Sequence, residues 1–425
     1  MSEKREAPPA AARVFVQTAR SDFPSLDDWS QMTEAEAQVA YEMTRRNELS
    51  GGTQTVRDFE SRWREWSGLK HAITTCNGSS ALYSAYFGLG VGPGDEVICP
   101  TYTWICSIGP SLLLGARPVF AESDPATMML DPADVRRRIT PKTRAIVAVH
   151  LWGNVCDMDA LMKVSAETGV PVIEDCSHAH GATYRGRPVG SFGQVACWSL
   201  QGSKPVSAGE GGVLATDDVE VFERACLVGQ CNRVVGLDLV TAKYAELQPL
   251  GLGMKLRSHP IAIGIAGVQL DRLGELNARR TAYVEEVEAG LERIPGLAPV
   301  EVYDGAKRAG FYGFPVHHRP EEQGATTAEF MAAVQAEGVP VRPSGYGVLH
   351  NLPLFAKGFD VFTRNRGPLG EGYRGYRPGD FPVTEKMVER LVFLPVLSNP
   401  APEAAGVLLG ALQRAAEQVR RPALV

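Results

Sequence analysis

The sequence lacks several features that would assign it to other classes of protein. No apolar run approaches the roughly 18 residues that a membrane-spanning helix needs. There is no block of Lys and Arg, and the formal net charge is −6, so nucleic acid is not an expected partner. The first residues, MSEKREAPPAAAR, have no apolar core of a signal peptide, and we expect residues 1–13 to be a disordered tail.

Cysteine pairs of the CxxC type are also missing. The eight cysteines are scattered, and most of them lie in apolar runs. This distribution is typical of buried free thiols in a reducing compartment, and it favours neither disulfides nor zinc. The sequence therefore predicts a cytoplasmic protein without a metal site or a membrane anchor.

What the chain does contain is an alternation of short apolar runs with helix-like segments. Buried, β-branched runs separated by helices predict an α/β fold with a mostly parallel central sheet. Near residue 270 the pattern changes to a long amphipathic helix, followed by mixed strands and helices. We expect a large domain at 14–272 and a smaller α+β C-terminal domain at 273–425. The expected strands of the large domain lie within 71–76, 95–100, 117–122, 143–153, 170–175, 194–200 and 211–216.

One lysine, Lys204, stands among Ser, Gly and Pro in WSLQGSKPVSAGEGG, without the charged neighbours of a solvated helix face. A low-dielectric site lowers the pKa of a lysine, and the neutral amine can then attack a carbonyl. Pyridoxal phosphate (PLP) uses such an amine as its Schiff-base partner. The cofactor also needs a carboxylate at its ring nitrogen, a phosphate site and an aromatic face.

Candidates for the ring contacts follow the ends of predicted strands. Asp175 ends the run VPVIED, and the carboxyl end of a buried parallel strand faces the crevice where ligands of α/β proteins bind. His178 could hydrogen-bond the ring hydroxyl, and Trp104 in PTYTWICS could stack on the ring. Taken singly, an acidic residue often just ends a strand, a lone His is more often structural, and a Trp is usually core.

The phosphate candidates lie where a strand turns into a helix. In CNGSSALYSAYF, Gly78, Ser79 and Ser80 open a helix whose free N–H groups and dipole attract anions. Ser199, shortly before Lys204, offers a second hydroxyl donor. An ordinary helix N-cap would explain Gly78 to Ser80 equally well.

Together and in this order, these residues match a family. The sequence resembles the fold-type I PLP-dependent aminotransferases of the DegT/DnrJ/EryC1/StrS group, which aminate keto sugars and keto cyclitols. The resemblance runs over nearly the whole chain, through NGSSAL, GVGPGDEVICPTYTW, EDCSHAHGATYRGRPVGSFG, WSLQGSK, GEGG, GIAGVQLDRL and VLHNLPLF. It implies a homodimer with active sites at the subunit interface.

The resemblance also implies a role for each candidate. Lys204 would form the Schiff base and move the proton, Asp175 would pair with the ring nitrogen, and His178 would lie near the ring hydroxyl. Trp104 would stack on the ring, and Ser79, Ser80 and Ser199 would hold the phosphate. Where members of the group usually carry an Asn and an Arg that reach the partner's phosphate, this chain has Gly253 and Lys255. Lys255 is therefore a candidate for supplying that charge.

WSLQGSK and GMKLRSHP look most like the branch that aminates inososes with L-glutamine in aminocyclitol antibiotic pathways. The resemblance thus implies L-glutamine (or glutamate) as donor and scyllo-inosose or 2-deoxy-scyllo-inosose as acceptor. Gln201 could contact acceptor hydroxyls, while a donor carboxylate prefers a cationic partner. The candidates for binding the donor are His150, Lys255, Arg342, Tyr346 and His350.

Three other hypotheses remain. The same chemistry on a nucleotide-linked keto sugar would require a longer, partly basic groove. A non-catalytic PLP-fold regulator or partner subunit would have lost Lys204 or Asp175, or gained a DNA-binding domain, and neither is seen. A Schiff-base lyase without PLP would leave Asp175, Trp104 and the serines unexplained.

Overall fold

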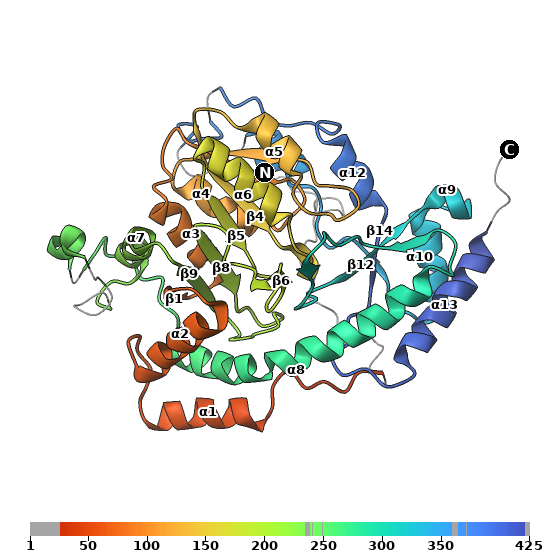
Figure 1. Cartoon of the computed structure of the whole chain (residues 1–425), viewed down its shortest axis with the longest axis horizontal. Coiled ribbons are helices and arrows are strands. Elements are labelled where there is room, and N and C mark those ends of the chain that lie inside the picture. Colours follow the sequence, from red (N-terminus) through yellow and green to blue (C-terminus); the bar gives the residue numbers. More distant parts are fainter. Residues whose placement is uncertain are drawn as a thin grey trace, which may run out of the picture.

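The structure is a computed structural model that describes residues 26–233, 239, 241–248, 250–358, 364–370 and 372–420. Its larger part is built on a seven-stranded sheet with the strand order β1-β9-β8-β5-β4-β2-β3 (Figure 1). The pairs from β3 to β8 are parallel, and β9 runs antiparallel to both β8 and β1. The strands are β1 His71–Thr75, β2 Glu96–Pro100, β3 Arg117–Ala121, β4 Thr143–Val149, β5 Val172–Asp175, β8 Val195–Ser199 and β9 Gly212–Thr216. The predicted α/β fold with a mostly parallel sheet is confirmed.

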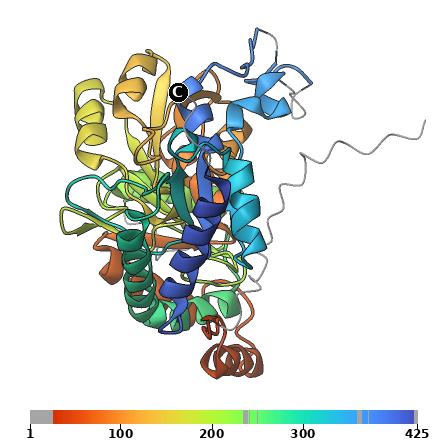
Figure 2. The same ribbon diagram turned by 90° about the vertical axis from the view of Figure 1, so that its right-hand side faces the viewer.

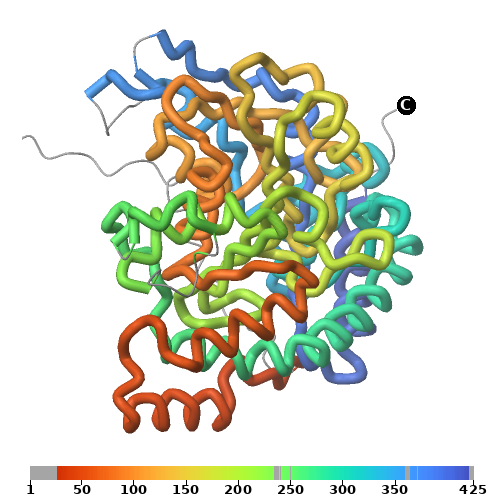
Figure 3. Tube along the Cα trace, turned by 60° about the vertical axis from the view of Figure 1, so that its left-hand side comes forward, coloured from red at the N-terminus to blue at the C-terminus, as the bar shows by residue number. Residues whose placement is uncertain are grey.

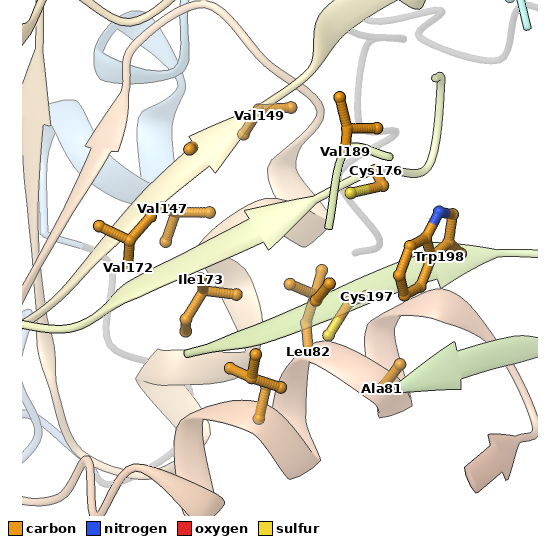
Figure 4. Packing of buried hydrophobic residues seen from close by; sticks show 14 of the residues in the cluster. Ala81, Leu82, Val147, Val149, Val172, Ile173, Cys176, Val189, Cys197 and Trp198 are labelled. Carbon is orange, nitrogen blue, oxygen red and sulfur yellow. The ribbon is translucent and has the colours of Figure 1, made fainter. Parts of the chain in front are cut away.

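Helices cover both faces of this sheet because its strands are apolar on both sides. On one face α3 packs against β8 and β9, with α4 and α7 beside it, and on the other α6 packs against β5 next to α5. In Figure 4, Leu82 of α3 lies next to Cys197 of β8, and both side chains are buried. The helices are α3 Gly78–Gly88, α4 Gly109–Leu113, α5 Pro132–Arg138, α6 Met158–Thr168 and α7 Val219–Gly229.

The smaller part has its own core around an antiparallel sheet with the order β10-β12-β14-β13. Helices α10 and α13 pack against each other beside it, and both stand out in the view of Figure 2. None of the described helices is both long enough and apolar enough to cross a membrane. The elements are β10 Leu297–Pro299, β12 Phe314–His318, β13 Arg342–Pro343, β14 Leu391–Leu394, α9 Pro320–Gln323, α10 Thr327–Ala336 and α13 Ala404–Val419.

One long helix, α8 (Pro260–Leu291), joins the two parts (Figure 1). It contacts α1 (Glu34–Arg45) and α2 (Gln54–Ser67) on one side and β10 and α13 on the other. Figure 3 shows the N-terminal helices running alongside it. Residue 272, where we placed the domain boundary, falls inside this unbroken helix. The boundary stays a prediction, and the two parts share α8.

Between β13 and β14 of the small part, the chain returns to the large sheet. The hydroxyl of Tyr376 accepts a hydrogen bond from Phe120 N (3.3 Å), and Arg117 Nε donates to Pro368 O (3.3 Å). Because both contacts lie along β3, this segment covers an edge strand that would otherwise expose unpaired backbone groups. The segment begins with α11 (Pro353–Ala356) and ends with α12 (Pro382–Glu389). A separate three-stranded sheet is formed by β6 Thr183–Tyr184, β7 Arg187–Pro188 and β11 Ala306–Lys307.

A buried carboxylate next to Asp175 fixes the chain around the carboxyl end of β5. Glu174 is fully buried and accepts hydrogen bonds from the backbone N–H groups of Gly190 (2.7 Å), Phe192 (2.7 Å) and Gly193 (2.6 Å), and from His150 Nε2 (3.1 Å). Burial alone would raise the pKa of Glu174, but the hydrogen bonds from His150 and the amides lower it below its usual value. The loop at 190–193 is thereby tied to β5.

We expect Glu174→Gln to destabilise the fold by about 3 kcal/mol, because a side-chain amide would face backbone donors that need an acceptor. The lowered pKa means that the stabilisation is present above the unfolded pKa of about 4.3 and is lost as the pH falls through the folded value. Urea denaturation of wild type and Glu174→Gln between pH 7 and pH 3 measures this, with exposed Glu403→Gln as the control. Equal midpoints at pH 7 would contradict the prediction.

Candidate active site

A cavity of about 470 Å³ lies at the carboxyl ends of the sheet strands, between the large and small parts. It is formed by the start of α3, the loops after β2, β5 and β8, and two short stretches of the small part. Nine predicted site residues line it: Gly78, Ser79, Trp104, Asp175, His178, Ser199, Gln201, Lys204 and Tyr346. A second cavity, of about 540 Å³ beside α12, contains none of the predicted residues.

Lys204 projects into this cavity from the loop after β8, where its backbone N–H donates to Gln201 O (2.8 Å). Only 8 % of the residue is exposed. Burial lowers the pKa of the amine to about 7, although Asp175 and the Cys106 thiol act in the opposite direction. A large fraction of the amine is therefore neutral near pH 7 and able to attack an aldehyde.

Asp175 ends β5 and is held in the cavity from both sides. Ser107 Oγ donates to one carboxylate oxygen (2.8 Å), and the backbone N–H of Ser177 donates to the other (3.2 Å). The carboxylate is buried, and it lines the same cavity as Lys204. A buried, fixed anion at this point suits a protonated ring nitrogen of PLP.

The turn at the start of α3 has the close packing of an anion cradle. The Asn77 side chain caps α3 by accepting from Ser80 N (2.8 Å). A Cβ atom on Gly78 would lie 2.8 Å from Ser199 Cβ, so the helix start and the end of β8 can approach only because residue 78 is glycine. Ser79 and Ser199 both line the cavity there, as a phosphate site requires. Ser80 does not line it, and its hydroxyl contacts Cys76 Sγ (3.1 Å).

Aromatic rings surround the remaining space. Trp104 is 38 % exposed at the cavity wall, with its ring centroid 5.3 Å from that of Tyr346. His178 Nδ1 accepts from Trp152 N (3.3 Å), and its Nε2 lies 3.4 Å from the Tyr346 hydroxyl. Burial, together with nearby Lys204, lowers the pKa of His178 well below its usual value, so the imidazole is neutral. These residues, with Lys204, Asp175 and the α3 turn, are suited to PLP.

The structure places two histidines that we gave a substrate role outside the cavity lining. His150 is fully buried, where its ring nitrogens bond to Glu174 (3.1 Å) and to Cys156 N (3.2 Å). His350 is also fully buried, between Thr101 Oγ1 (2.7 Å) and Glu385 (2.9 Å). Neither lines the cavity, because both act as internal hydrogen-bonding groups. We withdraw both as substrate ligands.

Two predicted cations lie outside the cavity lining. The Arg342 guanidinium packs over the Phe393 ring at 4.7 Å, and its buried Nη1 has no hydrogen-bond partner among the described residues. Lys255 is exposed, and its backbone pairs with Gln230.

Sequence reasoning missed several residues of the cavity. Ser107 and Thr103 belong to the strand end that carries Trp104, and their spacing around it was the available signal. Tyr312 comes from the small part, 108 positions after Lys204, and no local pattern connects the two. Glu210, in the GEGG stretch after Lys204, also lines the cavity.

We expect Lys204→Ala to retain the fold but to lose both the visible absorption band of lysine-bound PLP and turnover, because no other lysine lines the cavity among the described residues. Absorption spectra after adding PLP, together with circular dichroism, measure this. Lys142→Ala, which changes an exposed lysine outside the cavity lining, is the matched control and should keep the band. A normal band in Lys204→Ala would refute the assignment.

Comparison with known proteins agrees with this geometry. Residues 30–413 match the DegT/DnrJ/EryC1/StrS aminotransferase family. The chain is 37% identical over 284 residues to the L-glutamine:scyllo-inosose aminotransferase of Streptomyces griseus, covering 66% of this chain and 67% of that one. It is 35% identical over 308 residues to the GDP-perosamine synthase of Caulobacter vibrioides, covering 72% of this chain and 80% of that one.

Among solved structures, 3-amino-5-hydroxybenzoic acid synthase superposes with a TM-score of 0.78 at 27% identity, covering 93% of this chain and 99% of that chain. The family match spans most of the sequence, and the cavity brings together the lysine, carboxylate and helix start that PLP chemistry requires. The chain belongs to the DegT/DnrJ/EryC1/StrS aminotransferases and is a PLP-dependent aminotransferase.

Proposed function

We propose that the enzyme moves an amino group from L-glutamine, or glutamate, to a keto-cyclitol such as scyllo-inosose or 2-deoxy-scyllo-inosose, in the biosynthesis of an aminocyclitol antibiotic. The observation that carries the proposal is the chemistry of the cavity wall. Among the described residues that line it, Lys204 is the one cation, and neutral hydrogen-bonding groups predominate. Such a wall suits a compact polyhydroxylated ketone better than a charged diphosphate. Similarity to the Streptomyces griseus enzyme supports the same acceptor class.

The chain's own residues can perform the proton transfers of this reaction. When bound, PLP supplies an electron sink for the carbon that loses its proton. Lys204 Nζ, once released by the donor, takes the proton from the donor α-carbon and later returns one to the acceptor carbon. Asp175, held by Ser107 and Ser177, would stabilise the protonated ring nitrogen of bound PLP. Because burial lowers the pKa of Lys204 to about 7, proton removal should slow as the pH falls below 7.

We assign the donor carboxylate to Arg342 and the acceptor hydroxyls to Gln201. Arg342 has a buried Nη1 without a partner among the described residues, and burial lowers the pKa of its guanidinium. A carboxylate would satisfy that donor. Gln201 lines the cavity, and its Oε1 accepts from Ser203, which orients the amide nitrogen as a free donor. Tyr346 also lines the cavity.

A nucleotide-linked keto sugar is the competing acceptor, because the chain is also similar to a GDP-perosamine synthase. Its diphosphate would need cations near the mouth of the cavity. The regulator hypothesis is not retained, since Lys204 and Asp175 share one buried site. The eight cysteines are all free, which suits the reducing cytoplasm where we propose that the enzyme acts.

We also propose that the enzyme is a homodimer that joins through the segment between α7 and α8. Residues 241–248 and 250–255 project from the body beside α7, in green in Figure 1. Four of their apolar side chains are exposed: Leu247 (43%), Leu250 (58%), Leu252 (51%) and Met254 (39%). Such a cluster is typical of a surface that binds another protein. Lys255 follows directly in the chain. We propose that its ammonium contacts the phosphate of the PLP that the partner subunit binds.

The function is tested by the visible spectrum of the purified holoenzyme. We expect L-glutamine to bleach the band of lysine-bound PLP and scyllo-inosose to restore it, with Lys204→Ala as the inactive control. Restoration by a nucleotide-linked keto sugar alone would overturn the cyclitol acceptor and keep the aminotransferase. Restoration by neither would overturn both acceptors.

The dimer is tested by placing charge on the exposed segment. We expect the double variant Leu250→Glu, Leu252→Glu to sediment as a monomer and to bind PLP at least tenfold more weakly, because charged side chains would be desolvated at the interface. Val407→Glu, at another exposed apolar site on α13, should leave both properties unchanged. A double variant that remains dimeric would disprove the interface.

A further inference from the structure

Tyr312, just before β12, holds an unusual position over the lysine of the active site. Lys204 Nζ lies 3.5 Å from the centroid of the Tyr312 ring. The Tyr312 ring also stacks on the His178 ring, with 4.2 Å between the two ring centroids and an interplanar angle of 26°. The phenol hydroxyl lies 3.0 Å from Ser203 Oγ, one residue before the lysine. The small part of the protein thus presents an aromatic face to an amine of the large part.

This contact has a direct chemical meaning. An ammonium over the face of an aromatic ring is attracted by the ring quadrupole, and the attraction grows when water is excluded. Among the described residues, Lys204 Nζ forms no hydrogen bond or ion pair, so the ring is the contact that defines its position. A lysine side chain left without such a contact would populate several rotamers.

The aminotransferase reaction needs a defined position for this amine. During each cycle Lys204 is covalently bound to the cofactor in one stage and free in the next. While free, it must stay within reach of the carbon that exchanges a proton. If the amine moved away from that carbon, each proton transfer would be slower.

We propose that the Lys204 amine contacts the face of the Tyr312 ring whenever the amine is not bonded to the cofactor. Tyr312 is therefore a positioning residue for proton transfer. The proposal uses the aminotransferase chemistry of the chain and is independent of which acceptor is aminated. Ser203 holds the Tyr312 ring through its hydroxyl, and His178 holds the plane of the ring by stacking on it.

Other titratable groups also act on the amine, and the test must separate them from the ring. They come from the ends of β2 and β5 and the loop that follows β5, and they are Cys106, Asp175, His178 and His180. Removing the ring also removes the stacking partner of His178, whereas Tyr312→Phe keeps it, so the phenylalanine and leucine variants together report on the aromatic ring.

The experiment measures how fast the cofactor-free protein captures PLP, followed by the appearance of the visible band from pH 5 to pH 9. Capture requires the neutral amine, so the rate should rise through the pKa of Lys204, which lies at about 7 in the wild type. The ring stabilises the charged amine, and its removal in Tyr312→Leu should lower the inflection by about one pH unit. Tyr312→Phe keeps the face and should keep the wild-type inflection.

The matched pair of variants makes the result decisive. A shift in Tyr312→Leu with none in Tyr312→Phe supports the proposal. Equal shifts in both variants would assign the effect to the hydroxyl, and no shift in either would show that the ring does not hold the amine; both outcomes overturn it. Thermal melting checks that each variant folds, and Tyr312→Met replaces the leucine variant if that one does not. Failure here leaves the glutamine and inosose test unaffected, so the two proposals fail separately.

Discussion

The active site depends on keeping one amine out of water beside a carboxylate. Desolvation of Lys204 lowers its pKa to about 7, whereas Asp175 favours the charged form and opposes the change. If the lysine were exposed, it would be almost fully protonated near pH 7 and could neither attack an aldehyde nor accept a proton. If Asp175 were mobile, its charge would no longer stay where a ring nitrogen needs it. Ser107 and Ser177 prevent that movement, and Glu174 fixes the loop next to β5.

The fold brings these groups together because parallel strands deliver their carboxyl ends to one edge of a sheet. Asp175 ends β5, Ser199 ends β8, and the loop after β8 carries Lys204. Glycine at position 78 lets the start of α3 approach β8 closely enough to share an anion site. The small part then closes the cavity with Tyr312 and Tyr346, and α8 joins it to the large part without a break. The cavity is therefore a property of both parts together.

Selectivity for the acceptor is a separate matter from the chemistry. The chain is similar both to a relative named for scyllo-inosose and to one named for GDP-perosamine, so family membership cannot distinguish the two acceptors. What differs between the two substrates is charge. The cavity wall described for this chain carries mostly neutral donors and acceptors, and the unpartnered Arg342 Nη1 does not belong to that lining. That distribution favours a neutral ring with hydroxyl groups and a donor with a carboxylate.

The sequence by itself determined the order of the large-domain strands and placed Lys204, Asp175, Trp104 and Ser199 at or after strand ends, because these depend on local hydrophobic patterns and short spacings. It could not tell a cavity histidine from a buried one. His150 and His350 also follow apolar segments, but tertiary packing gives both rings internal partners. Nor could it connect Tyr312 with Lys204, since no local periodicity relates residues of separate sheets. Which side chains share a cavity was decided by how the two parts pack, because burial and hydrogen-bond partners come from segments distant in the chain.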